Sequence, residues 1–232
     1  MNNKDTYWVD FWNRYAKNSK EKDSHSQVLR TLNKKPIDSG LWRFTLDTID
    51  ASIEPNAKDA LLDLCCGNGM ISKYFSSKVD NIVSVDVSKD LIEKIDTNKY
   101  DNINAFDADI RDLSFKKSSF DKVIIYAGIQ YLTHQEVIKL LEKIFFWLKD
   151  DGILFIGDIP DSQKIWDFYN TPEREAVYFE NAAEGMDIVG TWFDVQFFSK
   201  LTNFIGFSQS SHIKQNSKLI YSSFRYDFKF VK

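Results

Sequence analysis

The sequence predicts an α/β fold, with a doubly wound, seven-stranded, mostly parallel sheet that is covered by helices. Two observations carry this prediction. Short apolar segments alternate with amphipathic segments from about residue 60 to residue 207, which is the pattern of parallel strands joined by helical crossovers. The last part of the chain instead alternates apolar and polar side chains around a turn, which predicts that the sheet ends in an antiparallel hairpin.

Five strands and their following helices can be placed in order. We expect the strands at 60–66, 81–87, 103–109, 120–128 and 152–160. Helices are expected at 70–78, at 89–95 with Ser88 as its cap, and after a Thr133-x-x-Glu136 capping box. Gly152 is expected just past that third helix, in a left-handed conformation. The hairpin is expected from residue 208 to residue 232, with its turn at Asn216 and Ser217.

The regions outside this alternation define the predicted domain organisation. Residues 1–50 are expected to form an N-terminal helical cap, and residues 51–232 the α/β domain. A helical, acidic and aromatic insertion is expected at about 161–190, after the fifth strand. An amphipathic helix is expected at 191–207.

Composition limits the class of protein. The chain has 232 residues, of which 43% are apolar, enough for a full core. No run approaches the roughly 20 apolar residues that span a bilayer, and the opening lacks a signal-peptide pattern, so we expect a cytoplasmic protein without membrane contact. Cys65 and Cys66 are too close for an ordinary disulfide and lack the partners of a zinc site, so no metal site is expected.

Charge is unevenly distributed along the chain. The segment from Arg14 to Arg43 holds eight Lys or Arg and three acids, whereas 161–190 holds seven acids and two bases. The basic segment could meet a phosphate or a carboxylate, or it could be a set of solvated helix faces. It is too weak a footprint to predict nucleic-acid binding.

The turn after the first strand predicts a cofactor site. In a parallel sheet, ligands bind at the carboxyl ends of the strands, where this turn lies. Gly67 and Gly69 let the backbone approach a ligand closely. Asp86 ends the second strand about 20 residues after Gly67, the offset at which an acid accepts hydrogen bonds from ribose hydroxyls. The pattern therefore indicates a cofactor that contains ribose.

Two kinds of cofactor fit this geometry. A dinucleotide fingerprint requires a third glycine, where this chain has Ser72. Asp63, at the end of the first strand, would repel a pyrophosphate but attract an ammonium or sulfonium cation. A nicotinamide-dependent oxidoreductase and a non-catalytic cofactor-binding module stay as alternatives to an enzyme that uses a sulfonium cofactor.

From about Leu61 to the C-terminal hairpin, the sequence resembles the class I S-adenosylmethionine-dependent methyltransferases. Their turn follows the pattern D-x-G-x-G-x-G, which this chain matches from Asp63 to Gly69 with Cys65 in place of the first glycine. The resemblance implies a Rossmann-like methyltransferase fold, S-adenosylmethionine as cofactor and S-adenosylhomocysteine as product.

The resemblance also implies roles for individual residues. Asp86 would bind both ribose hydroxyls, Val87 would pack on the adenine, Asp109 would accept from the adenine amino group, and Ile110 would offer its N–H to the ring. The remaining cofactor contacts that it implies are Asp63, Cys65, Cys66, Gly67, Asn68, Gly69, Tyr126 and Ala127.

Methyl transfer is an in-line displacement that needs a base only when the acceptor must lose a proton as it attacks. His134 and Asp158 follow the fourth strand and end the fifth, so they are the candidate catalytic residues. Each also has a purely structural reading, His134 as an exposed first-turn residue and Asp158 as a carboxylate that bonds the loop backbone.

The acceptor is expected to be a small molecule. Aromatic residues near the N-terminus would form a lid that includes Tyr15, and Trp192 beyond the insertion would form the opposite wall. The resemblance also implies that Gln130 and Tyr131 lie near the transferred methyl. Because no D/N-P-P-Y/F run follows the fourth strand, we expect no nucleic-acid partner and favour a hydroxyl of a sugar or other metabolite, with methylation of a basic peptide as a further alternative. The sequence does not predict an oligomeric state.

Overall fold

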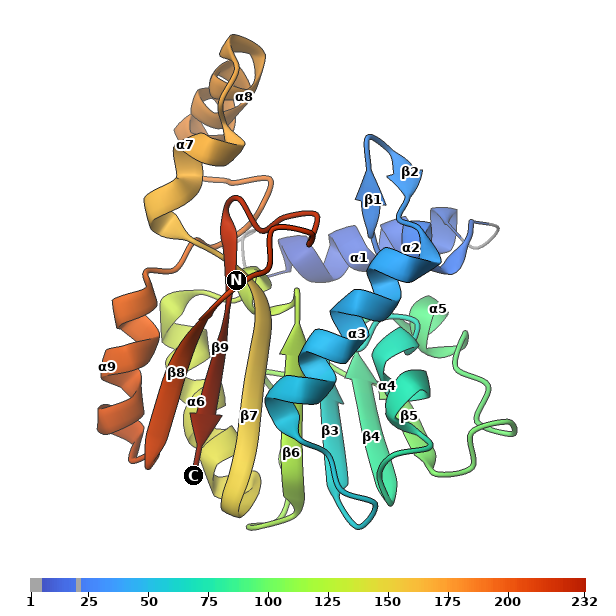
Figure 1. Ribbon diagram of the computed structural model, residues 1–232. Coiled ribbons are helices and arrows are strands. Elements are labelled where there is room, and N and C mark those ends of the chain that lie inside the picture. Colours follow the sequence, from blue (N-terminus) through green and yellow to red (C-terminus); the bar gives the residue numbers. More distant parts are fainter. Residues whose placement is uncertain (1–5, 20–21) are drawn as a thin grey trace.

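The fold is built on one large sheet, and the computed structural model describes residues 6–19 and 22–232. Residues 1–5 and 20–21 of the expected cap lie outside the described residues. The strands are β3 (Ala60–Leu64), β4 (Asn81–Asp86), β5 (Ile103–Asp107), β6 (Phe120–Tyr126), β7 (Leu148–Pro160), β8 (Gln209–Lys214) and β9 (Arg225–Val231). Their order is β5-β4-β3-β6-β7-β9-β8 (Figure 1). Among these strands β9 runs against its neighbours, which confirms the mostly parallel sheet and the reversed strand at its end.

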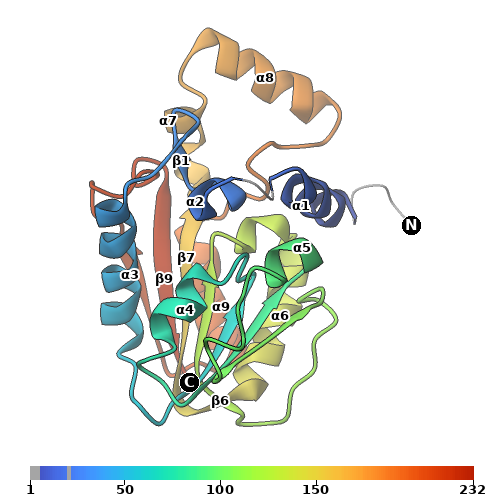
Figure 2. The ribbon, with the colours of Figure 1, turned by 90° about the vertical axis from the view of Figure 1, so that its right-hand side faces the viewer.

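Helices cover both faces of the sheet, as Figure 2 shows edge-on. The face that includes Leu61 and Phe155 packs against α3 (Ser39–Ile53), α4 (Met70–Phe75) and α5 (Lys89–Ile92). The opposite face packs against α6 (His134–Trp147) and α9 (Val195–Ile205). Coverage on both sides explains why β3 is buried at all five positions and reads as a nearly continuous apolar run.

Three local predictions need correction. Gly152 does not end α6 in a left-handed conformation; it lies inside β7, and Asp151 before it has φ +62°. The expected turn at residues 216–217 is a longer connection between Lys214 and Arg225. Ser88 occupies the N-cap position of α5 but its side chain makes no capping bond, and the helix has four residues, not the seven expected. By contrast, Thr133 and Glu136 form the predicted capping box.

The N-terminal region lies across the carboxyl ends of the strands (Figure 1). It consists of α1 (Tyr7–Asn18), α2 (Ser24–Gln27) and a small hairpin, β1 (Thr31–Leu32) with β2 (Lys35–Pro36). The expected boundary at residue 50 falls within α3. Since Leu46, Ile49 and Ile53 of this helix are buried against the sheet, α3 belongs to the α/β core.

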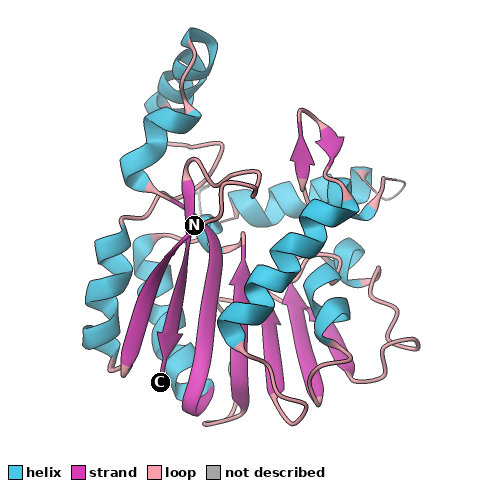
Figure 3. Cartoon of the chain, in the orientation of Figure 1, coloured by secondary structure: helices cyan, strands magenta, loops and turns pink. Residues whose placement is uncertain are grey.

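The insertion after β7 projects beyond the same end of the sheet (Figure 3). It contains a 3-10 turn, η2 (Ser162–Lys164), then α7 (Ile165–Phe168) and α8 (Pro172–Ala183). None of the residues of α8 is buried. Within the described residues, no helix combines the length and apolar character needed to cross a bilayer.

Candidate cofactor and acceptor site

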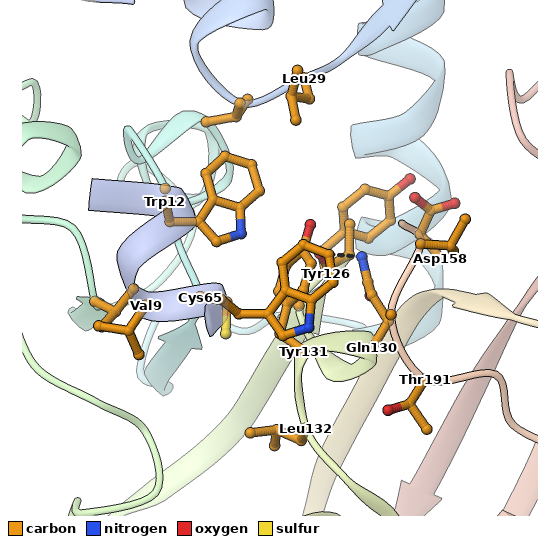
Figure 4. A pocket seen from close by; sticks show the side chains of 18 of the residues that line it. Val9, Trp12, Leu29, Cys65, Tyr126, Gln130, Tyr131, Leu132, Asp158 and Thr191 are labelled. Atoms are coloured by element: carbon orange, nitrogen blue, oxygen red, sulfur yellow. Dashed lines mark hydrogen bonds between the residues drawn. The ribbon is translucent and has the colours of Figure 1, made fainter. Parts of the chain in front are cut away.

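A cavity of about 1000 Å³ opens at the carboxyl ends of the strands, where the strand order reverses between β3 and β6. This volume lies at the upper end of the range for small-molecule sites. Figure 4 shows its walls, which come from the glycine turn, α1, the end of β6 and the loop that precedes α9. Thirteen predicted site residues line it: Cys65, Cys66, Gly67, Asn68, Asp86, Val87, Asp109, Ile110, Tyr126, Ala127, Gln130, Tyr131 and Asp158.

The glycine turn is tightly packed against the N-terminal region. Gly67 has φ +57°, and a Cβ at this position would lie 2.8 Å from Cγ1 of Val28. Asn68 is buried, and its amide donates to the carbonyl of Ser24 and to Oε1 of Gln27. Its own Oδ1 is buried without a hydrogen-bond partner. The turn thus holds α2 in place over the cavity.

Asp86 is held rigidly by the backbone of the turn. Its Oδ2 accepts from the N–H of Gly67 and its Oδ1 from the N–H of Ser88, each at 2.9 Å. Burial raises the pKa of this carboxyl, and these backbone donors oppose the shift. Because each carboxylate oxygen can accept a further hydrogen bond, Asp86 can receive two ribose hydroxyls without moving.

Asp109 lies one strand further along, paired with Arg111 at 2.6 Å. Arg111 also pairs with Glu136 at 2.7 Å. Burial alone would raise the pKa of Asp109, but the hydrogen bonds from Arg111 bring it below its ordinary value. Asp109 is therefore an ionised acceptor in a fixed position, which suits the predicted contact with an adenine amino group.

Asp63 differs from its prediction, because the structure places it beneath the turn and outside the cavity lining. Its side chain accepts a 2.5 Å hydrogen bond from Ser72, which in turn accepts from Ser84. Burial raises the pKa of Asp63 to about 7. The structure therefore shows no contact between this carboxyl and the cavity, and its hydrogen bond with Ser72 joins β3 to α4.

The raised pKa of Asp63 has a consequence for stability. A carboxyl whose pKa is higher in the folded state stabilises the protein fully at low pH, and this contribution is lost as the pH rises through about 7. We expect the free energy of unfolding of the wild type, relative to Asp63→Asn, to fall between pH 5 and pH 8 in urea titrations. The exposed control Asp80→Asn should show no such trend, and an equal difference at both pH values would contradict the assignment.

Cys65 and Gly128 form a second close approach in the turn. Cys65 has φ +58°, a conformation that favours glycine and explains the glycine of the family pattern. A Cβ on Gly128 would lie 2.5 Å from Cβ of Cys65 and 2.6 Å from its Sγ. The two positions are therefore sterically coupled.

This coupling predicts that Cys65→Gly rescues the defect of Gly128→Ala. Gly128→Ala should lower both the free energy of unfolding and the affinity for S-adenosylhomocysteine, since it displaces the turn. Cys65→Gly removes both opposing atoms, so the double variant should recover most of the loss, with a coupling energy of about 0.5–3 kcal/mol in a double-mutant cycle. Strictly additive effects would show that the two residues do not share this space.

The opposite side of the cavity is aromatic. Tyr131 contacts the rings of Trp8 and Trp12 at 4.7 and 5.7 Å between centroids. Gln130 is buried, and its Nε2 donates to the carbonyl of Ala127 (Figure 4). Its Oε1 has no partner. This side therefore combines apolar rings with one unsatisfied acceptor.

His134 does not join the site. Its ring lies against Phe193 and Phe197, at 4.8 and 4.9 Å between centroids, and it is not among the residues that line the cavity. Burial lowers its pKa. The structure gives it no path to an acceptor, so the prediction of a general base at this position is not carried further.

Tyr15, Trp192 and Gly69 also lie outside the cavity lining. The hydroxyl of Tyr15 donates to the carbonyl of Ser26, which ties α1 to α2. The indole N–H of Trp192 donates to Asp187. Gly69 is the left-handed N-cap of α4. These residues support the walls of the cavity rather than forming them.

Sequence reasoning missed three cavity residues that surround Asp158. Arg30, Tyr221 and Arg225 come from segments far apart in the chain, and all three line the cavity. The excess of basic residues between Arg14 and Arg43 was the only available signal for Arg30. Nothing in the sequence distinguished Arg225 from the polar partners of an edge hairpin.

Comparison with known proteins agrees with this geometry. Residues 61–152 match a family model described as "Methyltransferase domain". The Ubiquinone/menaquinone biosynthesis C-methyltransferase UbiE of Wigglesworthia glossinidia brevipalpis is 28% identical, over 70% of this chain and 72% of that protein. The Cypemycin N-terminal methyltransferase of a Streptomyces species is 32% identical, over 41% of this chain and only 40% of that protein.

Solved structures share the fold. A phosphoethanolamine N-methyltransferase 1 of Haemonchus contortus, in complex with phosphoethanolamine and S-adenosylhomocysteine, has a TM-score of 0.71 and 15% identity, covering 96% of this chain and 48% of that one. A putative S-adenosylmethionine-dependent methyltransferase of Methanococcus maripaludis has a TM-score of 0.61 and 16% identity, covering 95% and 93%. The fold is thus the Rossmann-like methyltransferase fold.

The matched methyltransferase domain and the shared fold support a class I S-adenosylmethionine-dependent methyltransferase. The protein is an enzyme whose cofactor is S-adenosylmethionine. The residues present fit that cofactor, since the acceptor carboxyls of Asp86 and Asp109 and the close backbone at Gly67 line one cavity.

Proposed function

We propose that this enzyme transfers the methyl group to a small-molecule acceptor bound in the same cavity, beside Tyr126, Gln130 and Tyr131. The observation that supports this proposal is a cavity of about 1000 Å³, whose lining includes both the glycine turn and residues of the N-terminal helix and the insertion. A space of this size can hold a cofactor and a second small molecule.

The residues of the chain would bind and orient the two substrates and would exclude water from them. S-adenosylmethionine, when bound, supplies an electrophilic methyl group on a sulfonium. Asp86 and the backbone at Gly67 would hold its nucleoside end, as the resemblance implies. The rings of Trp8, Trp12 and Tyr131 would exclude water and could present their faces to a cation. Positioning of this kind can supply much of the rate enhancement of a displacement reaction.

Several acidic residues of the cavity are held in ion pairs, and this affects which acceptor atom the enzyme can methylate. A hydroxyl acceptor would need a base, and the described residues that line the cavity include no histidine. Asp109 and Glu136 are paired with Arg111, and Asp158 is paired with Arg30. Burial raises the pKa of Tyr131 to about 12, so its neutral phenol accepts no proton at neutral pH.

Two further acids lie on the insertion side of the lining. Asp187 accepts from Tyr169 and Trp192, and Glu184 is exposed to solvent. Neither is a buried base free to take a proton from an acceptor. We therefore propose an amine nitrogen, reacting in its neutral form, in preference to the sugar hydroxyl that the sequence favoured.

The test is transfer of labelled methyl groups from S-adenosylmethionine to matched pairs of amines and alcohols that share a carbon skeleton. The proposal expects labelled amine products together with one equivalent of S-adenosylhomocysteine, at rates that rise with pH toward the pKa of the amine. Labelled alcohols without labelled amines would overturn it. Binding of the cofactor without transfer to any member of the panel would favour the non-catalytic module.

A further inference from the structure

Two arginines meet at one carboxylate in the wall of the cavity. Nη1 of Arg30 lies 2.7 Å from Oδ2 of Asp158. Nη1 of Arg225 lies 3.5 Å from the same oxygen and donates to the main-chain carbonyl of Asp158 at 2.6 Å. Both arginines are more than nine-tenths buried, and all three residues line the cavity. The wall therefore carries two guanidinium groups and one directly paired carboxylate.

The backbone explains why Asp158 reaches this position. The pairing of β7 with β9 shifts in register between Ile156 and Ile159, and Asp158 adopts φ +63° within the irregularity. Its N–H donates to Oδ1 of Asp227 on β9. Bulges of this kind redirect a side chain and are frequent beside functional sites.

A second carboxylate, that of Asp227, lies behind this wall. Asp227 is not among the residues that line the cavity, and it accepts from two neutral donors, the N–H of Asp158 and Nε2 of Gln215. Burial raises the pKa of Asp227 to about 6, so its own charge is costly there. At neutral pH Asp227 is still mostly ionised and offsets charge from behind the wall, whereas the two guanidinium groups and Asp158 are the charged groups of this wall that line the cavity.

Aromatic rings fix the orientation of both guanidinium groups. Arg30 lies over Tyr126 at 4.9 Å and over Tyr221 at 5.8 Å. Arg225 lies over Tyr221 at 5.4 Å and over Phe224 at 5.5 Å. Oriented guanidinium groups of this type are suited to recognising a carboxylate or a phosphate.

Two unsatisfied atoms indicate that a ligand completes this wall. Nε of Arg225 is a buried donor without a partner, and Oε1 of Gln130 is a buried acceptor without one. Both residues line the cavity. Buried polar groups of native proteins are nearly always paired, so each such atom requires an explanation. Neither atom has accessible surface in this conformation, so a bound molecule with an anionic group and a hydrogen-bond donor would satisfy both only if the two side chains shift toward the cavity.

We propose that Arg225 and Arg30 bind an anionic group of the methyl acceptor, a carboxylate or a phosphate, and that Gln130 accepts a hydrogen bond from the same molecule. The proposal rests on the proposed function, since it names the class of acceptor. The proposed amine acceptor and the proposed anion site together define the substrate as a small amine that carries a carboxylate or a phosphate.

The carboxylate of the cofactor is a second possible source of the same chemistry, and the experiment must separate the two. We would saturate the protein with S-adenosylhomocysteine and titrate it with inorganic phosphate and with acetate by calorimetry. Affinities for S-adenosylhomocysteine and for methylthioadenosine, which lacks the amino-acid part, would be measured in the same variants.

The variant is Arg225→Gln, and the matched control is Arg43→Gln, which removes an arginine from the exposed face of α3. Loss of a charge-assisted contact predicts anion binding about 10- to 100-fold weaker in Arg225→Gln and unchanged in Arg43→Gln. Both nucleoside affinities should stay unchanged, which would also show that the variant folds. Should Arg225→Gln fail to bind either nucleoside, Arg30→Gln provides the same comparison.

Three results have defined meanings. Unchanged anion affinity in the variants would overturn the proposal. Loss of affinity for S-adenosylhomocysteine but not for methylthioadenosine would overturn it in favour of the cofactor carboxylate. Anion binding that depends on Arg225, without methyl transfer to any amine, would support the anion site and refute the proposed function. In the transfer assay, an amino acid should also be methylated in preference to its amide.

Discussion

Replacing Asp86 by asparagine is expected to weaken the binding of S-adenosylhomocysteine by about 10- to 100-fold or more. The carboxylate is held by the N–H groups of Gly67 and Ser88, so its free acceptor positions are fixed before the ligand arrives. Asparagine has nearly the same size but replaces one oxygen by an amide group that donates. One of the two backbone donors then faces another donor, and the charge that strengthens both ribose contacts is lost. Calorimetric titration would measure the affinity directly.

The matched control for this prediction is Asp107→Asn. Asp107 ends the neighbouring strand β5, is exposed, and is not among the residues that line the cavity. The Asp107→Asn substitution removes the same charge from the same edge of the sheet. It should leave the affinity for S-adenosylhomocysteine nearly unchanged. Equal losses in the two variants would mean that long-range charge, rather than the contacts of Asp86, governs cofactor binding.

Replacing Asp158 by asparagine is expected to lower the free energy of unfolding by about 3–5 kcal/mol at pH 7, because it removes the carboxylate that pairs directly with two buried cations. Asparagine tolerates the left-handed conformation of this position, so the variant isolates the effect of charge. Urea unfolding monitored by tryptophan fluorescence measures the difference.

The pH dependence of this difference has a definite sign. Burial acts to raise the pKa of Asp158, but Arg225 and Arg30 bring it below its ordinary value. A carboxyl with a lowered pKa stabilises the folded state above its unfolded pKa of about 3.9, and the contribution is lost as the pH falls through the folded value. The advantage of the wild type over Asp158→Asn should therefore persist from pH 7 to about pH 4 and vanish only below it.

The exposed variant Asp47→Asn, which breaks a surface pair with Arg43, should have only a small effect under the same conditions. Should Asp158→Asn be as stable as the wild type while losing methyl transfer, Asp158 would return to the catalytic role that the sequence predicted. Its ion pairs with Arg30 and Arg225 instead make it a positioning residue for the two guanidinium groups.

The parts of the site that the sequence predicted are those encoded by local spacing. The turn from Cys65 to Gly69 and the acid at Asp86 are separated by one strand and one helix, so their spacing alone places them at one edge of the sheet. Gln130 and Tyr131 follow directly from β6, and the family resemblance implied their place near the transferred methyl. Local order along a parallel sheet is sufficient for such residues.

Other parts depended on side-chain direction, which spacing does not determine. Asp63 lies on the central strand, but its side chain points under the turn to Ser72 rather than into the cavity. His134 begins α6 as expected, yet its ring turns toward Phe193 and Phe197. A shift of one residue in strand register, or a different side-chain rotamer, would change the direction of either side chain. The sequence carries no direct signal for register or rotamer.

The anionic subsite could not be predicted, because it joins distant segments. Arg30 and Asp158 are 128 residues apart, and Arg225 and Asp158 are 67 apart. Their meeting requires both the N-terminal region that lies across the sheet and the irregular pairing of β7 with β9. Only a cluster of basic residues in the sequence pointed toward a phosphate or carboxylate.

The cavity at the carboxyl ends of β3 and β6 is expected to hold the cofactor, with the acceptor beyond it against Arg225. A crystal structure of the complex with S-adenosylhomocysteine tests this central claim most directly. We predict that the ribose hydroxyls bind Asp86, that the adenine lies beside Asp109 and Ile110, and that the sulfur faces Tyr126 and Tyr131. We predict no contact between the cofactor and Arg225. A nucleoside bound elsewhere, or an amino-acid carboxylate held by Arg225, would contradict the claim.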